Sequence, residues 1–209
     1  MHALRASLPD RITSRPGRSL SLVLSVSNRI ALPVRVERVD AHRGGQLSEQ
    51  TNEVVEVPTI RAIKDWIGNV PHHQWHIRTL QNLPRAVNVL TTHSDWLFSS
   101  LVLGCNGLLS GSGSVIADLQ GRLFRAVQRN DFAEAKRLND RIEPTARVFY
   151  ADPIVDMHNR MKEALVLLGK LPRAVVRPPL AKIERAEIVR IREALIEADL
   201  LDKNARHAA

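Results

Sequence analysis

Three short apolar segments, each followed by a helical segment, constrain the fold of this chain more than any other feature. The apolar segments have strand character, and the segments that follow them are amphipathic. The strand-like segments are 54–64 (VVEVPTIRAIK), 86–92 (AVNVLTT) and 106–111 (NGLLSG), and the helical ones are 72–83, 95–104 and 114–130. This alternation predicts parallel strands joined by helical crossovers, an α/β fold. Crossovers of this length fit a barrel and a doubly wound sheet equally well.

Helical segments alone follow residue 130. They lie at 131–151, 157–169 and 185–201. Asp131 stands where an N-cap is expected, and Gly169 and Gly104 stand where a helix is expected to stop. The sequence therefore predicts three α/β units followed by a helical tail.

The first 52 residues differ from the rest of the chain. They contain no aromatic residue, and residues 1–45 carry eight Arg, no Lys and three acidic residues, a net charge of +5 out of +8 for the whole chain. Segments 19–26 and 31–39 alternate like strands, although Pro33 limits the second to a sheet edge. Three interpretations are open: a truncated or frame-shifted start, which we favour, an organelle transit peptide, or a basic arm that binds nucleic acid.

Composition excludes several classes of protein. One cysteine, Cys105, excludes an internal disulfide framework and a Cys-based zinc site. No apolar run reaches the roughly 18 residues that a membrane span needs, so we expect a cytoplasmic protein without membrane partners. The segment GSGSV (111–115) lacks the third glycine of a dinucleotide-binding fingerprint, and no GxxxxGK[ST] motif occurs.

Lys64 is the strongest candidate for chemistry. It ends an apolar strand-like segment, and in a parallel sheet or barrel the carboxyl ends of the strands form the active-site face. Apolar surroundings lower the pKa of a lysine there, and a neutral amine can attack a ketone to form an imine. The competing interpretation is a lysine that points to solvent.

Other polar residues are weaker candidates. The second strand ends in Thr91, Thr92, His93 and Ser94. These residues either bind substrate or serve as turn and cap residues. His72, His73 and His76 share a helical segment, but no HExxH pattern accompanies them, so we expect a solvated helix face. Asp152, Asp156 and His158 lie near Tyr150 in sequence, and capping accounts for the acids.

Several blocks resemble the dihydrodipicolinate synthase / N-acetylneuraminate lyase family, from Val54 to Leu201. They are VPTIRAIKDWIGN (57–69), LGCNGLLSGSGSVIADL (103–119), NDFAEAKRLNDRIEPTARVFY (130–150), MKEALVLLG (161–169) and VRPPL (176–180). The resemblance implies a partial (β/α)₈ TIM barrel, with the three strands as strands six to eight and a C-terminal helical extension. It divides the chain into residues 1–52 and a half barrel over 53–209.

The resemblance also implies roles for single residues. Lys64 aligns with the Schiff-base lysine, and Leu109 and Ser110 border the keto-acid pocket. Thr92, His93 and Ser94 fall on positions that help choose the second substrate, where relatives often have Gly-Asp-Asp or Gly-Asp-Glu. The family's carboxylate-binding threonine pair and proton-relay tyrosine belong upstream, yet no tyrosine precedes Tyr150.

The implied function is that of a class I aldolase or lyase. Lys64 would form an imine with pyruvate or a related 2-keto acid, the second substrate would be an aldehyde, and no metal or organic cofactor would be needed. Relatives are commonly homo-oligomers. Because only 63 residues precede Lys64, we expect a truncated enzyme with weak or no activity. The alternatives are a non-catalytic remnant or binding module, and a basic nucleic-acid binder.

Overall fold

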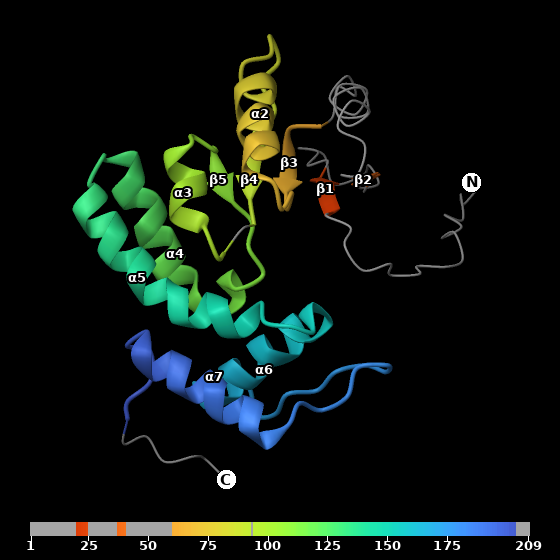
Figure 1. The fold of residues 1–209 in the computed structure, drawn as a ribbon, viewed down its shortest axis with the longest axis vertical. Coiled ribbons are helices and arrows are strands. Elements are labelled where there is room, and N and C mark those ends of the chain that lie inside the picture. The colour runs from red at the N-terminus through yellow and green to blue at the C-terminus, as the bar shows by residue number, and fades with distance from the viewer. Residues whose placement is uncertain (1–19, 25–36, 41–59, 93, 204–209) are drawn as a thin grey trace, which may run out of the picture.

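A computed structural model describes residues 20–24, 37–40, 60–92 and 94–203 (Figure 1). Five strands and six α-helices are placed in this part of the chain, together with one short 3₁₀ helix. They are β1 (Leu20–Leu24), β2 (Glu37–Asp40), β3 (Ala62–Asp65), α2 (Val70–Leu80), β4 (Asn88–Thr91), α3 (Leu97–Val102), β5 (Gly107–Leu108), α4 (Gly113–Gln128), α5 (Phe132–Phe149), η1 (Ile154–Asp156), α6 (Met157–Leu167) and α7 (Arg185–Glu197).

The strands form one sheet in the order β2-β1-β3-β4-β5. β3, β4 and β5 run parallel, as the alternation of strands and helices predicts, so the α/β class is confirmed. β1 pairs antiparallel with both β2 and β3. In the parallel part, Lys64 stands opposite Leu90, and Leu90 stands opposite Gly107. Residues in register share a face of the sheet, so Leu90 and Gly107 lie on the face to which Lys64 belongs.

Local signals in the sequence set the ends of several helices. The side chain of Asn69 accepts a hydrogen bond from the backbone N–H of His72 at 3.0 Å and so caps α2, and Asp131 does the same for α5 through Glu134 N–H at 3.1 Å. Gly104 (φ 102°) follows α3 and Gly169 (φ 69°) follows α6, in a conformation that favours glycine. The predicted stop positions are thus confirmed.

The core joins the sheet to the helices that cover it. Figure 1 shows α2 and α3 beside the parallel strands, α4 and α5 across the middle, and α6 and α7 at the opposite end. The buried apolar side chains come from all of these layers, among them Ile63, Val89, Leu123, Leu138, Ile142, Phe149, Ile191 and Leu195. Burial of such side chains is the main favourable contribution to folding.

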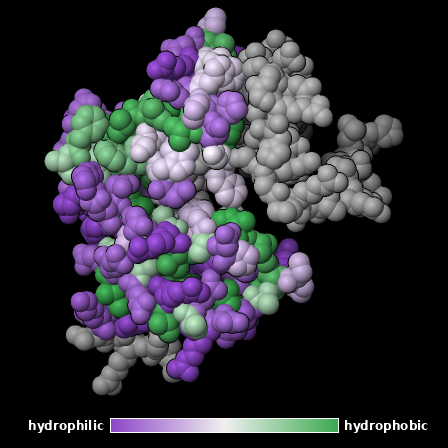
Figure 2. Space-filling view, in the orientation of Figure 1, coloured by the Kyte–Doolittle hydropathy of each residue, from purple (hydrophilic) through white to green (hydrophobic). Residues whose placement is uncertain are grey.

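The surface of the described part is mainly polar, with scattered apolar areas. Figure 2 shows purple over most of the helices, broken by green. Among the exposed large apolar side chains of the described part, Ile154 and Val155 of η1 are consecutive in sequence. Within the described ranges, no helix combines the length and the apolar character needed to cross a membrane.

Candidate functional site

Lys64 is the third of the four residues of β3, next to the carboxyl end of the strand. The ends of the three parallel strands are tied together by backbone hydrogen bonds. Thr92 N–H donates to Asp65 O at 3.0 Å, and Leu109 N–H donates to Thr91 O at 2.8 Å. The carboxyl ends of β3, β4 and β5 therefore meet at one edge of the sheet, where ligands of α/β proteins usually bind.

The side chain of Lys64 is partly buried, and burial lowers its pKa from the ordinary value of 10.5. The physical cause is the loss of water around the ammonium group, which disfavours the charged form. A lowered pKa increases the fraction of neutral amine at a given pH. This is the state in which lysine attacks a carbonyl carbon.

Asp65 lies on the opposite face of β3 and is fully buried. Its Oδ2 lies 2.7 Å from Nδ1 of His73 and 2.9 Å from Nδ1 of His76, and its Oδ1 accepts a hydrogen bond from Ile67 N–H at 2.9 Å. A carboxylate oxygen can accept a hydrogen bond from each of the two Nδ1 atoms. His73 and His76 are therefore buried partners of Asp65, and the prediction of a solvated helix face was wrong for them.

The contacts continue from His73 into α3. Nε2 of His73 lies 2.6 Å from Oγ of Ser100, and Trp96 meets the His73 ring edge-on at a centroid distance of 5.1 Å. Beyond Ser100, the Cys105 thiol donates to Gly107 O at 3.5 Å. Burial raises the pKa of this thiol, which favours its protonated, less reactive form.

A second polar cluster lies beyond the ends of β4 and β5. Oγ of Ser94 lies 2.5 Å from Oγ of Ser110 and 3.0 Å from Oγ of Ser112, and it donates to the Tyr150 hydroxyl at 3.1 Å. Ser112 N–H also donates to this hydroxyl at 3.2 Å. The Gln120 amide donates to Ser112 Oγ at 2.8 Å, while its Oε1 has no hydrogen-bond partner. The structure thus brings the predicted Ser94 and Ser110 together.

Ser112, Tyr150 and Gln120 were not predicted as members of this cluster. Tyr150 lies 56 residues after Ser94, and no sequence spacing relates the two. The sequence did contain one signal, since Tyr150 is the single tyrosine of the chain. The acidic residues near it also differ from expectation, because Asp156 precedes α6 but its side chain forms no capping hydrogen bond.

The remaining predicted residues have different positions. Thr92 is buried, whereas Leu109 is 39 % exposed. Leu109 and Ser110 line a hollow of about 490 Å³ between β5 and α4, which also includes Leu90, the register neighbour of Lys64. His93 lies outside the described residues.

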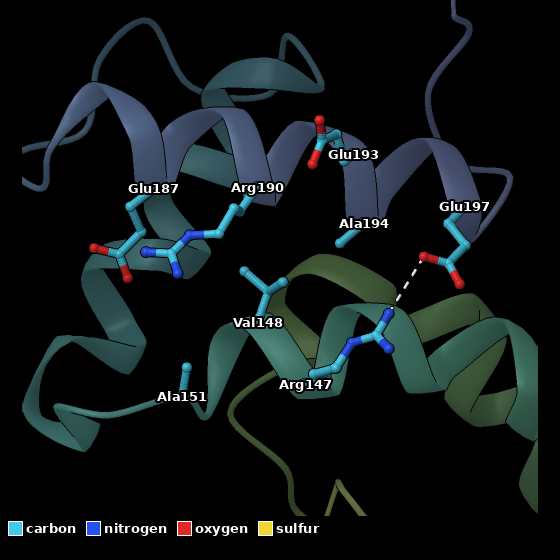
Figure 3. Close-up of a pocket in the computed structure, with 8 residues that line it drawn as sticks. All are labelled: Arg147, Val148, Ala151, Glu187, Arg190, Glu193, Ala194 and Glu197. Atoms are coloured by element: carbon cyan, nitrogen blue, oxygen red, sulfur yellow. Dashed lines mark hydrogen bonds and ion pairs between the residues drawn. The ribbon is translucent and has the colours of Figure 1, made fainter.

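A separate hollow of about 350 Å³ lies between α5 and α7 (Figure 3). Charged side chains line it, and Arg147 pairs with Glu197 at 3.3 Å across the gap between the helices. Val148 and Ala194 supply apolar surface. This hollow includes neither Lys64 nor any residue of the strand ends. In the described part of the chain, no group of three or more His, Cys, Asp or Glu side chains has an arrangement that could hold a metal ion.

Comparison with known proteins finds similar sequences. A curated relative is the putative 2-dehydro-3-deoxy-D-gluconate aldolase YagE of Escherichia coli K12, 27% identical over 178 residues, which are 84% of this chain and 58% of that protein. The 4-hydroxy-tetrahydrodipicolinate synthase of Acidobacterium capsulatum is 24% identical over 80% of this chain and 55% of its own length. The chain thus spans less than three fifths of the length of these relatives.

Solved structures show the same fold. The crystal structure of YagE from Escherichia coli K12 in complex with pyruvate matches with a TM-score of 0.62 and 26% identity, over 74% of this chain and 49% of that one. Dihydrodipicolinate synthase from Thermotoga maritima matches with a TM-score of 0.65 and 17% identity, over 74% and 51%. A model of the Dihydrodipicolinate synthetase family matches residues 26–198, a range that begins upstream of Val54 and includes half of the segment 1–52. The chain belongs to the dihydrodipicolinate synthetase family.

Proposed function

We propose that this protein is a Schiff-base-forming, pyruvate-dependent lyase of the aldolase type, with Lys64 as the nucleophile. The observation that carries the proposal is the position of Lys64: a partly buried lysine with a lowered pKa, at the carboxyl end of a parallel strand. Membership of the family supports it, as does the pyruvate complex of the relative YagE.

The neutral amine of Lys64 attacks the C2 carbonyl of the 2-keto acid, and the carbinolamine loses water to give an imine. Loss of a proton from C3 then gives an enamine, which adds to the carbonyl carbon of an aldehyde. Hydrolysis of the new imine frees the product and restores the lysine. The imine itself accepts the electron pair, so this chemistry needs no metal or organic cofactor.

The substrate contacts in this proposal come from the strand ends beside Lys64. Leu109 and Ser110 would border the keto acid, and Thr92, His93 and Ser94 would face the aldehyde. The 2.5 Å contact between the hydroxyl groups of Ser94 and Ser110 supports a shared wall of the pocket. The opening of the adjacent hollow to Leu109 and Ser110 supports access to it.

The architecture that we propose is the last part of a (β/α)₈ barrel. β3, β4 and β5 would be its last three strands, within a unit that covers residues 53–209, and the helices after α4 would form the C-terminal extension.

Borohydride trapping with pyruvate, read by peptide mass spectrometry, tests the proposal. We expect a reduced pyruvyl adduct on Lys64, its absence in Lys64→Ala, and its retention in Lys170→Ala, which removes an exposed lysine from the turn after α6. A folded sample without an adduct would contradict the proposal and favour a non-catalytic remnant. Adducts spread over exposed lysines in proportion to their exposure would also contradict it.

A further inference from the structure

Four buried polar side chains behind β3 form what we call the Asp65 array: Asp65, His73, His76 and Ser100. Asp65, His73 and Ser100 are 0% exposed, and His76 is 3% exposed. The contacts within the array measure 2.6–2.9 Å and join β3 to α2 and α3. Buried polar networks are costly when incomplete, so this one requires a reason to be retained.

The order carboxylate, imidazole, hydroxyl is that of a serine hydrolase triad. Ser100 is fully buried, however, so no substrate carbonyl can reach its Oγ. Cys105 does not extend the reactivity, because its thiol is buried and donates to Gly107 O. The array therefore influences the position of neighbouring residues and does not react with a ligand.

The proposed catalytic residue nearest to the array is Lys64, which directly precedes Asp65 in the chain. The Asp65 side chain is hydrogen-bonded to two histidines and accepts a hydrogen bond from Ile67 N–H, and the Asp65 carbonyl accepts one from Thr92 N–H. Both the side chain and the main chain of this residue are therefore held. Lys64 lies on the other face of the strand, so its Cα cannot shift unless some of these bonds break.

We propose that Asp65 is a positioning residue for Lys64, supported by His73, His76 and Ser100. The inference rests on the proposed imine chemistry at Lys64. A displacement of about 1 Å at a reacting group can cost on the order of 10²-fold in rate, so a rigid strand end matters for catalysis beyond its effect on stability. The array supplies this rigidity from the face of the sheet that substrate does not reach.

The test compares Asp65→Asn and Ser100→Ala with the matched control Thr145→Val in the full chain. Thr145 is also fully buried, and its hydroxyl donates to Ile142 O at 2.7 Å in α5, away from β3. Ser100→Ala and Thr145→Val each remove one buried hydroxyl group. Trapping of pyruvate on Lys64 is followed against pyruvate concentration, and each rate is normalised to the folded fraction from circular dichroism.

We expect Asp65→Asn to lower the maximal trapping rate by about tenfold or more, and Ser100→Ala by a smaller factor. The half-saturating pyruvate concentration should change by less than about twofold in both, because the array touches no substrate. Thr145→Val should keep both values. A merely structural role would instead lower the folded fraction and leave the rate per folded molecule unchanged, and this result would overturn the proposal.

Further outcomes separate a failure of the positioning role from a failure of the proposed function. Low-field imidazole N–H resonances in the wild-type proton NMR spectrum, lost in Asp65→Asn, would support the array, and their absence would overturn it. A wild-type protein that shows these resonances but no pyruvyl adduct would refute the proposed function. The positioning role would fail with it, whereas an adduct that forms equally fast in Asp65→Asn refutes the positioning role alone.

Discussion

Replacing Arg160 by methionine should destabilise the helical half of the protein by about 3–5 kcal/mol. Arg160 is fully buried and pairs through Nε with Glu187. Its other nitrogens donate to the carbonyl oxygens of Ala151 at 2.6 Å, Asp152 at 3.2 Å and Phe149 at 3.4 Å. This one guanidinium group therefore supplies hydrogen-bond donors to the backbone carbonyl groups at and after the end of α5. Its ion pair also joins α6 to α7.

The magnitude follows from what the substitution leaves behind. Methionine fills much of the space of the arginine stem, so the loss of packing is small. Three carbonyl groups lose a charged donor, and hydrogen bonds to charged groups contribute about 1.5–3 kcal/mol each when intact. Two of the three donor–acceptor distances exceed 3.1 Å, so the summed loss of the three hydrogen bonds should lie near the lower end of the range that these values give. The carboxylate of Glu187 is 18% exposed and partly recovers its hydration.

Urea unfolding followed by tryptophan fluorescence measures this loss, since all three tryptophans lie in the described part of the chain. The control is Arg137→Met in α5, where Arg137 is 57% exposed and pairs with Glu134 at 2.7 Å. An exposed pair contributes about 0–1 kcal/mol, so this variant should unfold nearly as the wild type does. The double variant Arg160→Met/Glu187→Met should recover part of the stability, because an apolar pair replaces a broken ion pair. Equal stability of Arg160→Met and Arg137→Met would refute this reasoning.

Two other predictions concern Lys64 and Gly169. Burial lowers the pKa of Lys64, so its acetylation in the folded protein, followed by peptide mass spectrometry, should reach half of its maximal rate at a lower pH than in urea. The unfolded chain then holds the Lys64 proton more tightly than the folded protein, so the contribution of this group to the free energy of unfolding should rise as pH rises towards 10.5. Identical profiles of acetylation rate against pH in buffer and in urea would contradict both statements. Gly169→Ala should lower the free energy of unfolding by about 1 kcal/mol, because φ is 69° and no neighbouring atom lies within 4 Å of an added Cβ. Gly169→Asn should lose less in the same urea titration, and a larger loss for Asn than for Ala would count against conformational strain as the cause.

Much of the fold was predictable because its signals are local. The parallel strands β3, β4 and β5 follow from short apolar segments separated by amphipathic ones, and the cap of α5 follows from Asp131. Gly104 and Gly169 mark helix ends through a backbone conformation that other residues adopt at a cost. The place of Lys64 next to a strand end was predictable for the same reason, since a strand end can be read within a few residues.

The surroundings of Lys64 depended on tertiary structure. In the sequence, the histidines of α2 indicate a polar, solvated helix face. Two of them are buried in the structure, where they form hydrogen bonds with Asp65 of β3. The cost of burying a polar group is met by a partner, and the sequence does not say which partner the fold will bring.

The same holds for Ser94, Ser110, Ser112 and Tyr150, which meet across 16 to 56 residues of chain. Periodicity and capping are properties of neighbouring residues, so the sequence by itself determined the parallel strands, the helices and the place of Lys64 near a strand end. Contacts between side chains far apart in the chain depend on how the elements pack together. Only the tertiary structure decided which buried polar groups meet at the strand ends and behind β3.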